Sequence, residues 1–596
     1  MLAPDVRVVA MDLLRPPPGY HLDQAILTTY SLDLETLLAI PLAVLAHADQ
    51  GVDALLADPL LLVEGLREVG SRLHVFVDEG GMAVPRTARE LYSLLEPSVH
   101  PVRAPNGGAF HPKVWMARFV DDRHDVRLRV AILSRNLTFD RSWDVALTSE
   151  AVPAAKRKSR PSRDLAKLVR ALPDLSTLEL PGDVRATLEA LAGEIERTRF
   201  PSPGGFSDPI VFHSLGLSQS RKAWTPLSSG SRLLAMAPFL SRTALDQLSR
   251  VTGGERTLVA RQDQLDELPA DALERWSEVL VLADAVVDEA QDEGPSSPSG
   301  LHAKLLAIEH GWNVTWWVGS ANLSHAAWYG ANVEVMAEVT GLKGRQNGRS
   351  GEGIDRFFES GFRGLCEPYR RCEPASESEG VVAARHALHL ARKELVDADL
   401  RVVCVESEDG WSWVLQGDVT LPEGVHAEVW PVSVPEESAR TLELPVAWIL
   451  PVARLTAFAA FRLHVPGSGV DAERLTRKLP AEGMPEGRIN HVLRGLIGSP
   501  EHLLRFLRAL LGGLEALVDW GTGDGEGAEG QWGFGLGGDT LLEDLVRAAS
   551  RDPERLEPIR RILDDLCATD EGRRIIPEGL LDTWNAVEQA VDGTGT

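Results

Sequence analysis

Hydrophobic positions in the first part of the chain alternate between strand-like runs and stretches with helical spacing. Residues 73–78 form an apolar run that ends at Glu79-Gly80-Gly81, which predicts a buried strand running into a loop. Residues 34–46 repeat apolar positions at helical spacing, and a shorter helical pattern covers 87–95. A further apolar, partly β-branched strand is expected at 7–14. Strands that alternate with helices predict an α/β layer.

The same order of elements recurs further along the chain. Strands are expected at 231–237, 256–260 and 278–283, helices at 244–250 and 270–279, and a Pro-, Ser- and Gly-rich loop at 292–300. This recurrence predicts a second α/β layer of similar construction.

The pattern changes after about residue 375. Residues 401–465 indicate strands with Gly and Pro turns, whereas 485–518 and 539–592 have helical spacing, and a glycine-rich acidic stretch at 521–538 predicts a flexible loop. We therefore expect an α/β half at 1–215, a second at 216–375, a β-rich accessory region at 376–480 and a helical region at 481–596. Nothing in this last third indicates chemistry.

Composition and charge narrow the class of protein. The 596 residues are 44% hydrophobic and 25% charged, as in an ordinary globular protein, so collagen-like, coiled-coil and disordered classes are excluded. No apolar run approaches the roughly 20 residues of a membrane span, and the N-terminal residues lack a signal-peptide pattern, so we expect a cytoplasmic protein. Its four cysteines contain no Cys-x-x-Cys pair, which argues against a zinc ribbon or a disulfide framework. The net charge of −26 repels nucleic acid and anionic membranes, so a phosphate ligand must be held by local groups.

A short motif with chemical potential occurs twice. Each copy is His-x-Lys, then an apolar strand, then Ser-x-Asn-Leu followed by Thr or Ser, with His-to-Asn intervals of 25 and 20 residues. Composition alone predicts about 0.24 chance His-x-Lys pairs, so two copies that both lead to Ser-x-Asn-Leu are a poor fit to coincidence. The residues concerned are His111, Lys113, Ser134 and Asn136 in the first copy, and His302, Lys304, Ser320 and Asn322 in the second.

These residue types suit the transfer of a phosphoryl group. Side chains two apart on a strand share a face, so an imidazole can attack phosphorus while the ammonium group neutralises the non-bridging oxygens. Asn and Ser can donate further hydrogen bonds to those oxygens. With two copies, one histidine can serve as nucleophile and the other can protonate the leaving oxygen and later activate water. The scheme requires no metal, and we expect no cofactor.

The paired motifs resemble those of the phospholipase D superfamily. The resemblance covers roughly residues 1–375 and implies two α/β/α halves about a pseudo-twofold axis, which cleave phosphodiesters through a phosphohistidine without metal. The usual Asp five residues after the Lys is replaced by Arg118 and Glu309. The chain is thus similar to the branch that includes tyrosyl-DNA phosphodiesterases and nucleases of bacterial restriction and phage-defence systems.

The resemblance also implies a role for two carboxylates. In the family, an acid after the Asn accepts a hydrogen bond from a catalytic imidazole and fixes its tautomer. Asp144 and Glu334 stand at this place, with Asp140 a weaker candidate. Asp144 could instead cap a turn or pair with a neighbouring arginine. Ser134 and Ser320 could either touch phosphate or shape the turns in which they stand.

A basic run between the two motifs is a candidate contact for a polyanion. It includes Lys156, Arg157, Lys158 and Arg160 and contains no acid. Such a run could follow a nucleic-acid backbone, or it could be a solvated loop.

Three classes of function remain open. We expect a nuclease or DNA-end phosphodiesterase, with DNA favoured over RNA, His111 as nucleophile, His302 as general acid and base, and a helicase or ATPase as a possible partner. The roles of the two histidines could be reversed. A phospholipase or transphosphatidylase is less expected, because the sequence shows no membrane anchor or basic amphipathic helix. An inactive scaffold would be expected to have lost at least one of the six His, Lys and Asn residues.

Overall fold

A computed structural model describes most of the chain. The described residues are 13–45, 69–138, 142–156, 158–218, 223–224, 229–283, 300–344, 351–372 and 378–485, with part of 487–549 and most of 556–593. Several sequence-based expectations fall wholly or mostly outside them: the loops at 521–538 and 292–299, the strand at 7–14, the helical stretch at 485–518, and the residues Asp140 and Arg157.

Six strands form the first sheet. They are β1 (Tyr20–Thr29), β2 (Leu73–Asp78), β3 (Val99–Val102), β4 (Val114–Asp121), β5 (Val126–Leu133) and β6 (Ala146–Ala151). Their order is β3-β2-β1-β4-β5-β6. The first three strands run parallel, and β4, β5 and β6 are each antiparallel to the strand before them in the sheet.

Eight strands form the second sheet. They are β7 (Phe206–Leu215), β8 (Gly230–Met236), β9 (Thr252–Val259), β10 (Glu278–Leu282), β11 (Leu305–His310), β12 (Asn313–Gly319), β13 (Glu334–Leu342) and β14 (Cys366–Pro368). Strands β8 to β13 repeat the order and directions of β1 to β6, and β14 and β7 extend the two edges. The predicted pair of similar α/β halves is confirmed.

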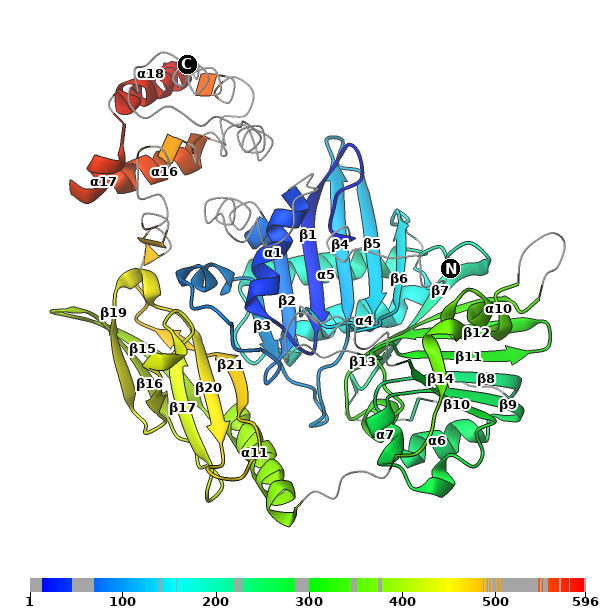
Figure 1. Cartoon of the computed structure of the whole chain (residues 1–596). Helices are drawn as coiled ribbons and strands as arrows, with labels where there is room; N and C mark the ends of the chain where they lie inside the picture. The colour runs from blue at the N-terminus through cyan, green and yellow to red at the C-terminus, as the bar shows by residue number, and fades with distance from the viewer. Residues whose placement is uncertain are drawn as a thin grey trace, which may run out of the picture.

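Helices cover both faces of the first sheet (Figure 1). The helices of the two halves are α1 (Leu34–Leu45), α4 (Arg163–Leu175), α5 (Gly182–Arg197), α6 (Arg242–Ser249), α7 (Gln262–Asp266), α9 (His325–Trp328) and α10 (Ile354–Glu359). Strand β4 is apolar on both faces, as a central strand covered twice must be. Its Trp115 and Phe119 pack in the cluster that contains α1, whereas Val114 and Met116 pack in the cluster that contains α4 and α5.

The two halves share one hydrophobic core. The cluster around α4 and α5 includes Ile26 and Met116 of the first sheet together with Met236 and Trp316 of the second. The opposite face of the second sheet packs on α6 in a separate cluster. Because burial of apolar surface is the main stabilising contribution to folding, this common core fixes the two sheets relative to each other.

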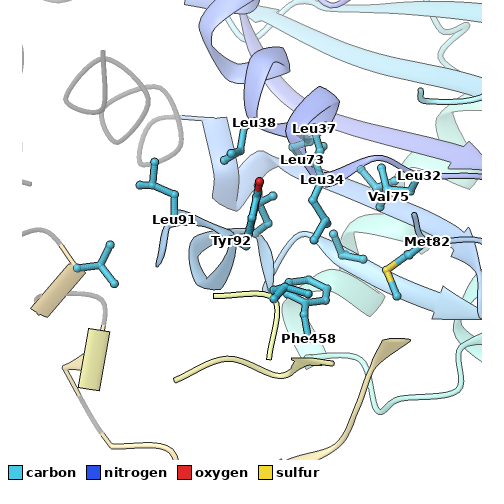
Figure 2. Packing of buried hydrophobic residues seen from close by; sticks show 14 of the residues in the cluster. Leu32, Leu34, Leu37, Leu38, Leu73, Val75, Met82, Leu91, Tyr92 and Phe458 are labelled. Carbon is cyan, nitrogen blue, oxygen red and sulfur yellow. The ribbon is translucent and has the colours of Figure 1, made fainter. Parts of the chain in front are cut away.

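A β-rich unit follows the long helix α11 (Glu379–Asp397). Its strands are β15 (Leu400–Ser407), β16 (Gly410–Gly417), β17 (His426–Pro431), β18 (Arg440–Thr441), β19 (Val446–Leu450), β20 (Phe458–His464), β21 (Glu473–Lys478) and β22 (Ala481–Glu482), in two four-stranded sheets. We call residues 378–485 the accessory module. Figure 2 shows Phe458 of this module beside Leu34, Val75 and Met82 of the first half, and all four belong to one buried cluster. The accessory module therefore shares a core with the first half.

The last described elements are helical, as the spacing over 539–592 predicts. They are α16 (Leu556–Cys567), α17 (Asp570–Ile575) and α18 (Leu580–Gly593). In the part of the chain that the structure describes, none of the helices has the length and apolar character needed to cross a membrane.

Several local expectations differ from the structure. Strand β1 was not predicted because its first residues are polar and partly exposed. Only residues 270–272 of the expected helix at 270–279 are helical, as a 3-10 turn. Helix α11 was also missed, although its buried residues stand three and four apart. Finally, β7 pairs with β13, so the chain enters the second sheet at Phe206 rather than at the expected boundary after residue 215.

Candidate active site

All six motif residues lie at one end of the two sheets. Each His-x-Lys segment directly precedes β4 or β11, and each Asn follows β5 or β12. Asp144 stands just before β6, and Glu334 is the first residue of β13. Since the strands of the two sheets have equivalent directions, the same three strand ends supply the same residue types in both halves.

Backbone hydrogen bonds join each motif to the acid-bearing segment of the other half. Phe110 forms a bridge with Val333, and the His111 N–H donates to the Val333 carbonyl at 2.9 Å. In the equivalent place, Leu301 forms a bridge with Trp143, and the His302 N–H donates to the Trp143 carbonyl at 3.0 Å. The first motif is thereby placed beside Glu334, and the second beside Asp144.

The imidazole of His111 is held between a carboxylate and an ammonium group. Its Nδ1 lies 2.8 Å from Glu334 Oε2, and its Nε2 lies 2.8 Å from Lys113 Nζ. An ionised carboxylate can only accept and an ammonium can only donate, so Nδ1 carries the proton and Nε2 carries the lone pair. His111, Lys113 and Glu334 are all buried. The nitrogen with the lone pair is the one that a nucleophilic histidine requires.

The second imidazole has the same kind of partner. His302 Nδ1 lies 3.1 Å from Asp144 Oδ1, so the carboxylate again fixes the Nδ1–H tautomer. Lys304 is buried like Lys113, and its Nζ donates to the carbonyl of His302 at 2.7 Å. The carboxylate of each pair comes from the opposite half, so neither half contains a complete His–acid pair.

The two serines support the carboxylates instead of facing a ligand. Both are fully buried; the Ser134 hydroxyl donates to Asp144 Oδ1 at 2.7 Å, and the Ser320 hydroxyl donates to Glu334 Oε2. Each hydroxyl also accepts the N–H of the residue that follows the acid. The weaker expectation that Ser134 and Ser320 bind phosphate is therefore corrected, because their donor hydrogens are already engaged inside the protein.

The two asparagines differ in their surroundings. The Asn136 side-chain oxygen accepts the N–H of Ser31 at 3.4 Å. The Asn322 side-chain oxygen is buried and has no hydrogen-bond partner among the described residues, while its backbone carbonyl accepts the indole N–H of Trp328 at 2.9 Å. Because a buried polar atom without a partner is costly, the Asn322 side-chain oxygen, which can only accept, marks a place for a hydrogen-bond donor.

Burial and neighbouring charges set the protonation states. Burial lowers the pKa of His111 to about 4, and the Lys113 ammonium adds to this against the opposing effect of Glu334. Burial likewise lowers the pKa of His302, opposed by Asp144. Burial alone would raise the pKa of Glu334 and Asp144, but their histidine and serine partners hold both pKa values below the usual range. Both imidazoles are thus neutral and both acids ionised near pH 7.

The two sets act on each other electrostatically. The Lys304 ammonium contributes to the lowered pKa of His111, and the Lys113 ammonium contributes to the lowered pKa of His302. The sequence-based prediction of one shared anion site requires such mutual proximity. Within the described residues, no group of three or more His, Cys, Asp or Glu side chains is arranged to hold a metal ion.

Comparison with solved structures gives partial matches at low sequence identity. A mutant of yeast tyrosyl-DNA phosphodiesterase matches with a TM-score of 0.36 and 11% identity, over 56% of this chain and 85% of that chain. A second structure of the yeast enzyme gives 0.33 and 13%, over 58% and 87%. Polyphosphate kinase from Porphyromonas gingivalis gives 0.29 and 15%, over 55% and 41%. Neither a protein-family model nor a curated protein sequence matches the chain.

The chain resembles the phospholipase D superfamily. The resemblance lies in the repeated His, Lys and Asn set and in the repeated sheet topology. Five residues after each Lys, where the usual phospholipase D motif has an Asp, this chain has Arg118 and Glu309. Both make structural contacts. Arg118 pairs with Asp23 and Glu194, and buried Glu309 accepts the N–H of Ile354 at 2.9 Å.

Sequence reasoning missed three side chains that surround the motifs. Asn332 accepts the Ala109 N–H at 3.0 Å and donates to Glu334 Oε1 at 3.2 Å, so it orients the acid. Asp78 accepts the Phe110 N–H at 2.8 Å, and the Tyr30 ring lies 5.3 Å from that of His111. Asp78 could have been found from the sequence, because it ends a predicted strand. The sequence pattern around Tyr30 and Asn332 gives no indication that they lie at the site.

The basic run lies at the other end of β6 from Asp144. Since β6 has six residues, the separation along the strand is roughly 20 Å. Lys156, Lys158 and Arg160 are exposed, and Lys158 pairs with Glu196 at 3.2 Å. Any contact of this run with a substrate would therefore be remote from the histidines.

Proposed function

We propose that the chain is a phosphodiesterase that cleaves nucleic acid, with DNA as its preferred substrate, through a phosphohistidine intermediate and without a metal cofactor. The observation that carries the proposal is the pair of imidazoles whose Nδ1 atoms are held by ionised, buried carboxylates, each beside a buried lysine. This arrangement supplies a nucleophile, a proton donor and two cations for one phosphate.

In the first step, His111 Nε2 attacks phosphorus and the bond to the leaving oxygen breaks. Lys113, Lys304 and the two asparagine side chains stabilise the negative charge on the non-bridging oxygens. Glu334 stabilises the positive charge that develops on the imidazole. For Nε2 to attack, Lys113 must exchange its contact with this atom for one with the phosphate.

His302 serves as general acid and then as general base. Its pKa is lowered in the free protein, but a bound phosphodiester adds a negative charge that favours the imidazolium form. The imidazolium protonates the leaving oxygen. The resulting neutral imidazole takes a proton from water, which attacks the phosphohistidine and releases His111.

Nucleic acid is the substrate class that the motif branch favours. Lys156, Lys158 and Arg160 offer exposed cations to a backbone, although the net charge of −26 opposes binding of a long polyanion. We therefore propose that cleavage of long DNA depends on a partner, such as a helicase or ATPase, in a DNA-processing or phage-defence system.

The proposal predicts cleavage that survives excess chelator. Short labelled oligonucleotides of single- and double-stranded DNA and RNA, whose cleavage needs no partner, and a phosphatidylcholine vesicle would be incubated with wild type, His111→Ala and His302→Ala. We expect cleavage of DNA by wild type and a loss of about 10²–10⁴-fold in either variant. Cleavage of the lipid alone would contradict a nuclease and indicate a phospholipase. No cleavage of any substrate would support an inactive scaffold.

A substrate with a good leaving group distinguishes the roles of the two histidines. A p-nitrophenyl ester of a nucleotide needs little protonation on departure, so His302→Ala should still form the phosphohistidine and accumulate it, whereas His111→Ala should form none. Trapping with ³²P-labelled substrate in acid-free quench would measure this. A labelled intermediate in His111→Ala would reverse the assignment.

A further inference from the structure

The loop after β2 is joined to the candidate active site by hydrogen bonds of its Asp78 side chain and of its backbone. We call residues 78–83 the bracing loop. Asp78 accepts the N–H of Phe110, the residue before His111, at 2.8 Å, and its other oxygen accepts the Gly80 N–H at 3.2 Å. The loop therefore holds the start of the first His-x-Lys segment.

The bracing loop also supports the segment that contacts Asn136. The Leu32 N–H donates to the Gly81 carbonyl at 3.1 Å, and the Ala83 N–H donates to the Leu32 carbonyl at 2.8 Å. Next to Leu32, the Ser31 N–H reaches the Asn136 side chain, and the Tyr30 ring lies against His111. The proposed nucleophile His111 and the proposed phosphate-binding residue Asn136 thus both depend on one loop.

The accessory module contacts the other side of this loop along its length. Arg392 of α11 donates to the Gly80 carbonyl at 2.7 Å. On β21, the Thr476 N–H donates to the Met82 carbonyl at 2.8 Å, and the Thr476 hydroxyl donates to the Ala83 carbonyl at 3.0 Å. Arg477 pairs with Glu79 at 3.0 Å. A Cβ at Gly80 would lie 3.2 Å from Val396 of α11, so the helix is in close contact with the loop.

Arg392 brings its charge close to the site as well. It pairs with Glu473 of β21 at 3.3 Å. Burial raises the pKa of Asp78 to about 6 and Arg392 opposes this shift; burial also raises the pKa of Tyr30, which Arg392 again opposes. Arg392 thus donates a hydrogen bond to the bracing loop at Gly80, and its charge acts on Asp78 and Tyr30.

From these contacts we infer that the accessory module is part of the catalytic apparatus. Arg392 is a positioning residue: through the bracing loop and Asp78 it holds His111 and Asn136 in the geometry needed to attack a phosphodiester. The inference rests on the function proposed above for these residues. It assigns a role to a region whose sequence shows no chemistry of its own.

Point variants of the full chain test this, because the module shares a core with the first half and cannot be removed cleanly. We expect Arg392→Ala to lower kcat tenfold to a hundredfold with KM within twofold, since small displacements of reacting groups have large effects on rate. Arg392→Lys should recover part of the loss. The matched control is Arg474→Ala, which removes a half-exposed arginine of β21 that pairs with Glu436 of the same module. It should leave kcat within twofold.

A double-mutant cycle separates positioning from general loss of stability. If Arg392 acts through Asp78, the effects of Arg392→Ala and Asp78→Asn on kcat should be strongly non-additive. Additive effects, or a lowered unfolding midpoint with unchanged kcat in folded protein, would overturn the inference while leaving the proposed function intact.

A readout without substrate keeps the inference testable if wild type cleaves no phosphodiester. Diethyl pyrocarbonate modifies neutral imidazoles, and mass spectrometry of the peptide that contains His111 measures its rate. We expect the rate to rise at least threefold in Arg392→Ala and to stay unchanged in Arg474→Ala. Equal rates in wild type and Arg392→Ala would refute the positioning role independently of activity.

Discussion

At the scale of single residues, the carboxylate behind each histidine decides which ring nitrogen can react. Glu334 and Asp144 are ionised acceptors, so each holds a proton on Nδ1 and leaves the lone pair on Nε2. The fully buried Ser320 and Ser134 hydroxyls donate to these same carboxylates. Of the residue types that were expected to contact phosphate, the serines therefore orient the acids, and the others are left to contact a ligand.

Replacement of Glu334 by Gln should reduce activity by on the order of 10³-fold or more. The amide of Gln can donate to Nδ1, which stabilises the tautomer with the proton on Nε2 and blocks attack. The matched control is Glu338→Gln on the same strand, where Glu338 pairs with His213 at 2.9 Å. Rates of phosphodiester cleavage would be measured for both; a control as impaired as Glu334→Gln would count against a tautomer effect.

At the scale of elements, the site forms because strand ends of one half join segments of the other. The loop before β4 approaches residues 331–334 so closely that only a glycine fits at position 108: a Cβ there would lie 2.4 Å from the backbone of Ala331. The Asn106 side chain crosses the same junction and donates to the Gly330 carbonyl at 2.8 Å. The connection before the first motif is thus a close contact between the halves.

Gly108→Ala should therefore separate this loop from Asn332 and Glu334. We expect a loss of roughly 1–3 kcal/mol in the free energy of unfolding, as for an overpacked contact, together with a fall in kcat. Gly70→Ala is the control, because a Cβ at Gly70 meets no atom within 4 Å. Urea unfolding and cleavage rates of both variants would be compared, and unchanged stability in Gly108→Ala would mean that the loop can move away without cost.

At the scale of the whole molecule, buried neutral histidines make the fold sensitive to acid. In the first half, His74 Nδ1 lies 3.2 Å from His100 Nε2. Burial, with Lys478 and His74, lowers the pKa of His100 to about 2, and burial lowers the pKa of His74. A folded-state pKa below the unfolded value of about 6.5 means that the unfolded chain binds more protons. Stability therefore falls as the pH decreases below about 6.5.

Between pH 7 and pH 5, the buried neutral His100 should therefore cost about 2 kcal/mol of stability. Between these two pH values the free energy of unfolding of His100→Gln should therefore fall by about 2 kcal/mol less than that of wild type. Urea unfolding at both pH values would measure this. His389→Gln changes an exposed histidine of α11 and should leave the difference between the two pH values as in wild type. An identical loss in His100→Gln and wild type would show that this histidine does not contribute.

The amino-acid sequence was enough to predict the two-half architecture, because the repeated His-x-Lys and Ser-x-Asn sets report a duplicated strand order. It also determined the chemistry proposed for His111 and His302, since residue type limits what a side chain can do. Which acid serves which histidine could be read from nothing but the three-dimensional structure, because Glu334 and Asp144 act across the junction between the halves. It alone also brought Arg392 to the loop that holds His111. Contacts between residues hundreds of positions apart depend on how whole sheets pack, and local patterns in the chain carry no record of that packing.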